Sequence, residues 1–336
     1  MRHLTITTFG QFLGVTGNRL AVQDKDGAIW ETPLSRLRSI RIEKPGVSIS
    51  AALILACASR GIRLYFVDWR NIALAAVCGQ NQHAVVNIRQ AQFRFLSSCT
   101  ASVVAHEMVR TKIRNQRALL LYFGKYISKT QPENFDAIRS AAQALESQAH
   151  RLNHGKNLST QTESHWLEEL LGIEGYCARE YWHCLASAAP LGESFCYRQG
   201  RGAIEPSNAA LNYGYAILMS YVWSALDNAG LELYAGIFHS NRPGKPSLVL
   251  DFMEEYRAWV VDRNIVKLRK KLNNDLTELT PAIKHDIVDS IDETMASKIL
   301  WHGKKLSLEN IMQRQAYRLA GTFIDQRPYR GIRFKW

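Results

Sequence analysis

The sequence lacks the cysteine patterns that mark metal-stabilised or redox-active small domains. It has 336 residues and contains no CxxC pair and no spacing of cysteine and histidine typical of a zinc finger. Its six cysteines, at positions 57, 78, 99, 177, 184 and 196, are widely separated. Several of them stand in apolar or helical contexts. We therefore expect reduced, buried thiols of a cytosolic protein rather than disulfides.

Long hydrophobic runs are also missing. No apolar stretch approaches the ~18 residues that a membrane-spanning helix needs. The N-terminal MRHLTITTFG lacks the hydrophobic region of a signal peptide, and there is no internal repeat or low-complexity tract. These features predict a cytoplasmic protein with no membrane segment, long enough for two domains.

Negative charge is scarce relative to positive charge. Asp and Glu total 30 residues against 42 Lys and Arg, which gives a formal net charge of +12. Such an excess favours a polyanionic partner, and nucleic acid before a membrane surface. A basic soluble enzyme with no such partner is the alternative that net charge leaves open.

The first 80 residues have the pattern of a β-rich domain. Short strand-like runs alternate with polar or glycine-containing turns, and Asp24 to Gly27 predicts a hairpin turn in which Gly27 takes a positive φ. A helix of small residues, 47–59, is followed by Gly61, which suits a helix C-terminus. The predicted strands cover residues 4–8, 12–15, 19–22, 40–42 and 62–67.

Helical periodicity dominates after a short polar connector at 80–83. The predicted helices cover 84–99, 103–127, 135–152, 164–186 and a segment from Ser207, as N-cap, to Tyr221. The sequence therefore predicts an α+β protein of two domains. Residues 1–80 would form a β-rich, β-sandwich-like domain, and residues 84–336 an all-α catalytic domain.

The stretch from Tyr234 to Arg257 concentrates groups that bind hard metal ions. His239 ends an apolar run, and a polar turn separates it from Asp251, Glu254 and Glu255. On a helix starting at Asp251, the three carboxylates fall within an arc of roughly 100°. An imidazole with clustered carboxylates is half of a hard-metal site. The alternative is a solvated helix face, with His239 capping a turn.

Glu174 is an anomaly within the helix predicted at 164–186. It falls on the apolar face that Leu167, Leu171, Ala178, Tyr181 and Leu185 trace. A carboxylate there must be protonated, paired or metal-bound. Its flanking glycines, at 172 and 175, suit the close approach of a backbone or ligand. An ion pair with Arg179, or with an arginine from elsewhere, is the alternative to a metal.

Two other regions carry polar or basic groups. Asn208 and Asn212 share a helix face, near Arg201 and Tyr215, and are candidates to orient carboxylates or phosphates, or else simply solvated polar residues. Residues 263–271 form a basic run. The C-terminal QRPYRGIRFKW interleaves basic and aromatic residues, which is typical of contacts to phosphates and unpaired bases, or of a disordered tail.

Several separated motifs, in order, resemble one family. The sequence is similar to the CRISPR adaptation integrase, the catalytic subunit of the spacer-acquisition complex. The resemblance spans nearly the whole chain. The matching segments are VSISAALILACASRGIRLYFVD (47–68), VRTKIRNQRALL (109–120), LLGIEGYCAREYW (170–182), SNAALNYGYAIL (207–218) and GIFHSNRPGKPSLVLDFMEEYR (236–257).

The resemblance implies a β-rich N-terminal domain, an α-helical catalytic domain and a site for Mn²⁺ or Mg²⁺. By motif, Glu174, His239 and Glu254 would be the metal ligands, and Asp251 would support them. Many relatives read E-P-F-R where this chain has Glu254 to Arg257, so Glu255 competes with Glu254 for the third ligand position. The candidates for DNA contact or for support of the ligands are Arg179, Arg201, Asn208, Tyr215, Lys245, Glu255 and Arg257.

The implied activity is metal-dependent DNA transesterification, in which the 3′-hydroxyl of a short fragment attacks the CRISPR array. The implied partners are double-stranded DNA, a second copy of the chain and a small second adaptation protein that completes a hetero-hexamer. We expect residues 1–80 to form the homodimer. A transposon-encoded integrase or a branched-DNA repair nuclease is the rival within enzymes. A non-catalytic DNA-binding scaffold is the rival from another class.

Overall fold

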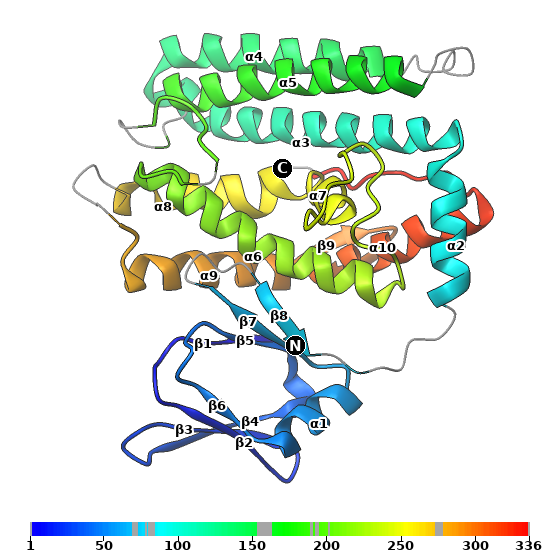
Figure 1. The fold of residues 1–336 in the computed structure, drawn as a ribbon. Helices are drawn as coiled ribbons and strands as arrows, with labels where there is room; N and C mark the ends of the chain where they lie inside the picture. Colours follow the sequence, from blue (N-terminus) through cyan, green and yellow to red (C-terminus); the bar gives the residue numbers. More distant parts are fainter. Residues whose placement is uncertain are drawn as a thin grey trace. The chain divides into compact units, whose positions relative to one another are not determined.

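The computed structural model describes residues 2–68, 73–77, 79, 85–152, 163–188, 191, 195–200, 202–272 and 278–334. The chain folds into two compact units, Met1–His83 and Ala84–Trp336. The first is rich in strands and the second in helices (Figure 1), so the predicted fold class is confirmed. The polar connector expected at 80–83 lies outside the described residues. No helix in the described ranges has the length and apolar character needed to cross a membrane.

The first unit consists of two four-stranded sheets, whose orders are β1-β5-β7-β8 and β4-β3-β2-β6. In the former, β1, β5 and β7 run parallel and β8 is antiparallel to β7; in the latter, β2, β3 and β4 form an antiparallel meander. Leucines from both sheets and from the helix α1 fill one core. The elements are β1 Arg2–Ile6, β2 Phe12–Thr16, β3 Arg19–Gln23, β4 Ile29–Pro33, η1 Leu34–Arg36, β5 Leu37–Ile42, β6 Ser48–Ile49, α1 Ala51–Ser59, β7 Arg63–Val67 and β8 Ala73–Val77.

Two turn predictions in this unit are confirmed. Gly27 has φ +84°, and the Asp24 carboxylate accepts hydrogen bonds from the backbone N–H groups of Asp26 and Ala28. Gly61 has φ +68° just after α1. The helix expected from residue 47 begins later, at Ala51, because Ser48–Ile49 pairs with β2 and the Ser50 hydroxyl caps the first turn.

The second unit is a helical assembly. The three long helices α3, α4 and α5 pack side by side, and α6 packs against α7, α9 and α10 (Figure 1). Its elements are α2 Val85–Leu96, α3 Thr100–Thr130, α4 Pro132–Arg151, α5 Glu163–Ser187, α6 Pro206–Asn228, α7 Ser247–Met253, the π-helix η3 Arg257–Asp262, α8 Arg263–Leu268, the 3₁₀ turn η4 Arg269–Lys271, α9 Pro281–Ala296, β9 Lys298–Trp301, β10 Lys304–Ser307 and α10 Leu308–Asp325.

Two details of this unit differ from the predictions. β9 and β10 form a hairpin within the domain expected to be all-α, and its turn residues His302 and Gly303 both have the positive φ that a type I′ turn requires. The N-cap of α6 is Glu205 rather than Ser207. The Glu205 carboxylate accepts from the N–H groups of Ser207 and Asn208, whereas the Ser207 hydroxyl donates to the Leu191 carbonyl.

The buried stripe of α5 is also rotated from the predicted one. Leu171 is 41% exposed, so its assignment to the core was wrong. The core side consists of Trp166, Leu170, Ile173, Cys177, Tyr181, Cys184 and Leu185. Among the five described cysteines none forms a disulfide, and Cys57, Cys177 and Cys184 are buried as expected, but Cys99 and Cys196 are exposed.

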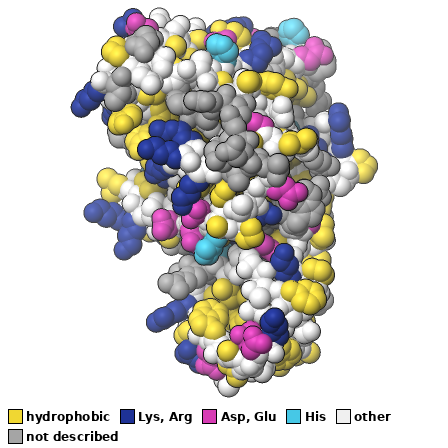
Figure 2. All heavy atoms as spheres, turned by 90° about the vertical axis from the view of Figure 1, so that its left-hand side faces the viewer, with side chains coloured by type: hydrophobic (Ala, Val, Ile, Leu, Met, Phe, Trp, Pro, Cys, Tyr) yellow, Lys and Arg dark blue, Asp and Glu magenta, His cyan; other side chains and the backbone are white. Residues whose placement is uncertain are grey.

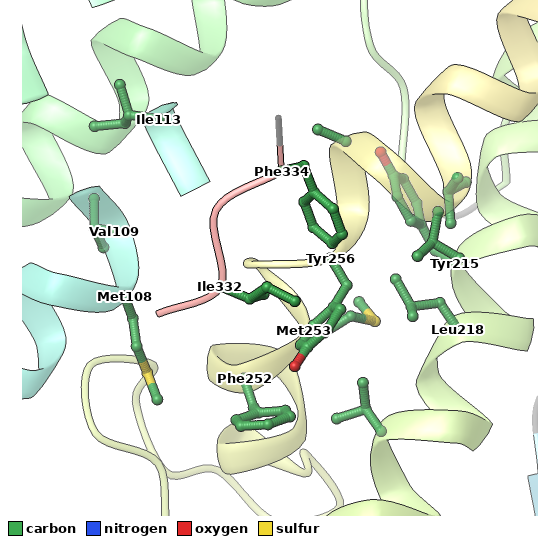
Figure 3. Packing of buried hydrophobic residues seen from close by; sticks show 14 of the residues in the cluster. Met108, Val109, Ile113, Tyr215, Leu218, Phe252, Met253, Tyr256, Ile332 and Phe334 are labelled. Carbon is green, nitrogen blue, oxygen red and sulfur yellow. The ribbon is translucent and has the colours of Figure 1, made fainter. Parts of the chain in front are cut away.

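Residues Tyr329–Phe334, here called the C-terminal strap, lie against α3 and η3. The Asn115 amide donates to the Ile332 carbonyl at 2.9 Å and accepts from the Phe334 N–H at 3.1 Å. Phe334 stacks on Trp259 with ring centroids 4.8 Å apart. Figure 3 shows Ile332 and Phe334 beside Met253 and Tyr256. Tyr329 and Phe334 are buried, so the expectations of base stacking by these rings, or of a disordered tail here, were wrong; residues 335 and 336 lie outside the described residues.

The close contact of Gly331 with α3 generates a prediction. A Cβ at this position would overlap the Thr111 side chain, and Thr111 is fully buried. We expect Gly331→Ala to lower the free energy of unfolding by about 1–3 kcal/mol, because the strap must shift from its seat. Urea unfolding followed by tryptophan fluorescence measures the loss. Gly200→Ala, where the added Cβ meets no described atom within 4 Å, is the control. Equal stability of both variants would contradict the close packing of the strap against Thr111 of α3.

Candidate active site

The amino group of Lys112 joins two carboxylates from distant parts of the helical unit. Its Nζ lies 2.5 Å from the Glu174 Oε1, on α5, and 2.8 Å from the Glu254 Oε2, just after α7. Their side chains are 12%, 16% and 3% exposed in the order Lys112, Glu174, Glu254. Packing of α3 against α5 and η3 therefore brings together two carboxylates that the motifs predicted separately.

Glu254 is held ionised by its neighbours. The Arg257 Nε lies 3.1 Å from the Glu254 Oε1. Burial alone raises the pKa of Glu254, but the charges of Arg257 and Lys112 outweigh it and lower the pKa to about 2. For Lys112, burial lowers the pKa, but Glu254 and Glu174 outweigh it and the net direction is upward. Both groups are therefore charged at neutral pH.

Asp251 organises the loop that carries His239. Its carboxylate is fully buried and accepts the backbone N–H groups of Ile237, Phe238 and His239 at 2.5, 3.3 and 3.1 Å. The His239 Nδ1 lies 2.5 Å from the same carboxylate. Burial raises the pKa of Asp251, and its contacts with His239 oppose that rise. An ionised Asp251 makes Nδ1 the donor and leaves Nε2 as an acceptor, as in metal-binding histidines.

The loop requires glycine at position 236. A Cβ there would lie 2.5 Å from the Ser247 Cβ and 3.0 Å from the Asp251 Oδ2. Gly236 thus permits the close packing that aligns three N–H groups on one carboxylate. The His239 side chain remains 22% exposed. The loop accordingly presents an oriented imidazole to solvent.

Glu255 points to the C-terminal strap. Its carboxylate accepts the Tyr329 hydroxyl at 2.6 Å and the Ile332 N–H at 3.0 Å, and burial raises its pKa to about 7. Glu254 and Glu255 are 3% and 0% exposed, so the alternative of a solvated helix face was wrong. The helix expected to start at Asp251 begins earlier, at Ser247, and stops at Met253, and a π-helix follows at Arg257. Glu254 and Glu255 therefore contact different partners, as adjacent residues that point in different directions.

A second buried network lies beside Arg257. The Asp262 carboxylate accepts the hydroxyls of Tyr181 at 2.7 Å and Tyr215 at 2.5 Å. The Arg257 guanidinium lies over the Tyr215 ring, 4.7 Å from its centroid. Of these two candidates, Arg257 contacts Glu254 directly, and Tyr215 lies against the same guanidinium. Through Arg257 and Tyr215, Glu254 is connected to an acidic residue, Asp262, that sequence reasoning missed.

The remaining candidates lie elsewhere or contact other groups. The Asn208 Oδ1 accepts from Arg198 at 3.0 Å, and the Asn212 Oδ1 accepts from the same guanidinium at 2.6 Å. The Asn208 Nδ2 donates to the Glu205 carboxylate at 2.9 Å, so these amides orient an arginine and the N-cap of α6 rather than Glu174 or Glu254. Arg179 is exposed, and the cation paired with Glu174 is Lys112 instead. Lys245 is half-buried in the turn before α7. Arg201 lies outside the described residues.

Sequence reasoning also missed Lys112 and Arg198. Lys112 stands between the fully buried residues Val109 and Ile113 of α3, so its position near a core face was a usable signal. Asp262 likewise ends the apolar run AWVVD. A charged residue within an apolar pattern needs a buried partner, and in both cases the partner comes from a distant segment.

Several features of the site suit a divalent cation. Two carboxylates already share one positive nitrogen, and the buried Glu254 Oε2 has no hydrogen bond, because Lys112 meets it at ion-pair distance without hydrogen-bond geometry. Carboxylate oxygens with an imidazole are donors that Mg²⁺ or Mn²⁺ accept. In the described part of the chain, no three His, Cys, Asp or Glu side chains are close enough to form a complete site. These donor atoms suit Mg²⁺ or Mn²⁺ chemically, and a third ligand has to move closer to complete the site.

The sequence comparisons with known proteins point to one family, and two solved structures share the fold. The family model described as "CRISPR associated protein Cas1" matches residues 4–280. The "CRISPR-associated endonuclease Cas1 1" of Francisella tularensis subsp. novicida is 42% identical over 337 residues and covers 100% of both chains. Among solved structures, a "Casposase bound to integration product" matches with TM-score 0.78 and 20% identity, over 98% of this chain and 93% of that one. A "Cas6-RT-Cas1--Cas2 complex" matches with TM-score 0.74 and 20% identity, over 99% and 36%.

Asp262 predicts a specific pH dependence of stability. Burial raises its pKa from 3.8 to about 6, so the folded protein keeps this proton after the unfolded chain has released it. Ionisation of Asp262 therefore destabilises the fold as the pH rises from about 4 to about 6. Since each pH unit is worth about 1.4 kcal/mol, the wild type should lose about 3 kcal/mol relative to Asp262→Asn over this window.

Urea unfolding of both proteins between pH 4 and pH 7 measures the difference. The exposed Asp289 supplies the control, Asp289→Asn, which should follow the wild type throughout. A stability difference between the wild type and Asp262→Asn that stays constant with pH would show that Asp262 ionises at its ordinary pH in the fold.

Proposed function

Because the chain belongs to the Cas1 family of CRISPR-associated proteins, we propose that it is the integrase and endonuclease of CRISPR adaptation. The observation that carries the site assignment is the pair Glu174 and Glu254, held around one cation, together with an imidazole, His239, that Asp251 orients. Identity of 42% over the whole chain to a CRISPR-associated endonuclease favours this role over a transposon integrase or a repair nuclease.

The proposed reaction exchanges one phosphodiester for another. The 3′-hydroxyl oxygen of a short DNA fragment forms a bond to a phosphorus in the CRISPR array, and the bond from that phosphorus to its 3′ oxygen breaks. The attacking hydroxyl loses a proton and the leaving oxygen gains one. Phosphodiester bonds are conserved in number, so no energy-supplying cofactor is needed.

We assign Glu174, Glu254 and the Nε2 of His239 as the groups that would hold Mn²⁺ or Mg²⁺. When bound, such a metal would polarise the phosphoryl oxygen and lower the pKa of the attacking or leaving oxygen. Asp251 fixes the imidazole orientation through Nδ1. Glu255 serves a different purpose, because its carboxylate binds the C-terminal strap.

The cationic groups of the site would receive DNA phosphate. Lys112 and Arg257 are 12% and 26% exposed, and the formal charge of +12 attracts a polyanion as a whole. Figure 2 shows Lys and Arg side chains in several groups over one face of the molecule. Beside Glu174, a Cβ added at Gly172 or Gly175 would meet no described atom within 4 Å. The absence of side chains at these two positions of α5 leaves room for a DNA strand. Among the described residues, no other backbone approaches Gly172 or Gly175 as closely as the sequence suggested.

We propose that the chain works as a homodimer together with Cas2, in a hetero-hexamer. The solved complex that contains Cas1 and Cas2 and shares this fold supports a Cas2 partner. In the first unit, β4 is the edge strand of its sheet, and Ile29 and Trp30 on it are 63% and 49% exposed. An apolar sheet edge is a surface that pairs with another chain, and a second copy about a two-fold axis would cover it.

The proposed ligands define the main test. We expect Glu174→Ala, His239→Ala and Glu254→Ala each to reduce DNA strand transfer by about a thousandfold or more, because several kcal/mol of charge stabilisation are lost. Integration of a labelled short duplex into a repeat-containing plasmid, with Cas2 and Mn²⁺, measures the rate. The exposed Glu168 supplies the control, Glu168→Ala. Near-normal integration by Glu174→Ala would refute the assignment. If Glu255→Gln is inactive while Glu254→Ala remains active, Glu255 is the third ligand instead of Glu254.

The dimer has a separate test. We expect Trp30→Glu in the full chain to produce a monomer, because a carboxylate would be buried without a partner at the sheet edge. Sedimentation equilibrium measures the mass. Leu55→Glu, at a position on α1 that is 70% exposed, is the control and should remain dimeric. A Trp30→Glu dimer as tight as the wild type would place the interface elsewhere.

A further inference from the structure

The Lys112 ammonium is the cation that lies between two carboxylates. Its Nζ contacts Glu174 at 2.5 Å and Glu254 at 2.8 Å. A divalent cation held between these two carboxylates would need the position of the ammonium, because Arg257 already contacts the other oxygen of Glu254, Oε1. Lys112 therefore has to leave at least one carboxylate before a metal binds.

The charges of the site already balance. Lys112 and Arg257 carry two positive charges, and Glu174 and Glu254 carry two negative ones. A divalent cation would add two positive charges to this balance, in a site whose least exposed side chain, Glu254, is 3% exposed. Such an excess is unfavourable in a medium of low dielectric constant unless an anion joins it.

Lys112 has the freedom to move where Arg257 does not. Lysine has a flexible four-carbon stem, and Lys112 contacts Glu174, whose side chain is 16% exposed and lies at the edge of the site. Arg257 is confined between Glu254 and the ring of Tyr215. A DNA phosphate arriving at this edge carries one negative charge and accepts hydrogen bonds from an ammonium. It would satisfy Lys112 after its release from the carboxylates.

We propose that Lys112 is an internal counter-cation that holds Glu174 and Glu254 together in the metal-free protein and couples metal binding to DNA binding. The inference rests on the proposed function, because it takes Glu174 and Glu254 as metal ligands and DNA as substrate. Metal displaces the ammonium, and DNA phosphate receives it. Each ligand therefore strengthens the binding of the other, by the same factor.

The test measures metal binding without catalysis. Free Mn²⁺ is followed by electron paramagnetic resonance in titrations of the full-length protein, with and without a short duplex DNA. The variant Lys112→Met removes the ammonium and keeps a side chain of similar length. Lys125→Met is the matched control, because Lys125 is an exposed lysine of the same helix. Lys112→Arg keeps the charge.

Without DNA, Lys112→Met should bind Mn²⁺ at least tenfold more tightly than the wild type, and Lys125→Met and Lys112→Arg should bind as the wild type does. Duplex DNA should tighten Mn²⁺ binding by the wild type at least tenfold. It should tighten binding by Lys112→Met by a clearly smaller factor, because no ammonium has to be relocated. Equal Mn²⁺ affinities of the wild type and Lys112→Met, or a wild-type affinity that DNA leaves unchanged, would overturn the inference.

Folding of the variant is part of the result. Without metal, Lys112→Met leaves two carboxylates facing each other, so its melting temperature should fall below that of the wild type and recover in millimolar Mn²⁺. A variant that stays unfolded in Mn²⁺ would also overturn the inference, since metal should replace the ammonium. If the wild type binds no Mn²⁺ even with DNA, the metal-dependent function itself fails, which is a separate outcome.

Discussion

The burial of the Glu254 charge constrains the rest of the helical unit. A carboxylate that is 3% exposed and still ionised costs several kcal/mol unless cations compensate it. Lys112 from α3 and Arg257 from η3 provide that compensation at 2.8 and 3.1 Å. Each of these two cationic side chains keeps its position only if the helix that carries it is held in place. The packing of α3, α5 and η3 is therefore a condition for the chemistry.

Outer contacts keep these helices in place. The C-terminal strap joins α3, through Asn115, to the backbone next to Glu254, through Glu255. On the other side, Asp262 with Tyr181 ties η3 to α5. Each of these polar groups is buried, so an error in position would leave an unsatisfied group at a cost of about 1–3 kcal/mol. The network thereby favours one arrangement of the site over near alternatives.

Local sequence patterns predicted the parts of the molecule that depend on neighbouring residues. Gly27 and Gly61 take the positive φ that their turn contexts require. The long helices follow from periodicity, and the change from strands to helices follows from the change in pattern. Glu174, with a charge among apolar residues, and Asp251, a few residues after His239, were recognisable as atypical. The hydrogen bond from His239 to Asp251 shows that these two residues, both identified from the sequence, are in contact in the structure.

Tertiary packing decided which groups meet. Nothing local to Glu174 indicates that its cation is Lys112 rather than Arg179, because the partner belongs to α3 and the pair forms only when α3 packs on α5. Nor does a helical pattern show which partners Glu254 and Glu255 meet, since Lys112 comes from α3 and the strap comes from the end of the chain. The sequence by itself determined the elements and the unusual residues, because these follow from backbone geometry and the cost of burying charge. Only the tertiary structure decided the partners, because they are far apart along the chain and become neighbours through packing.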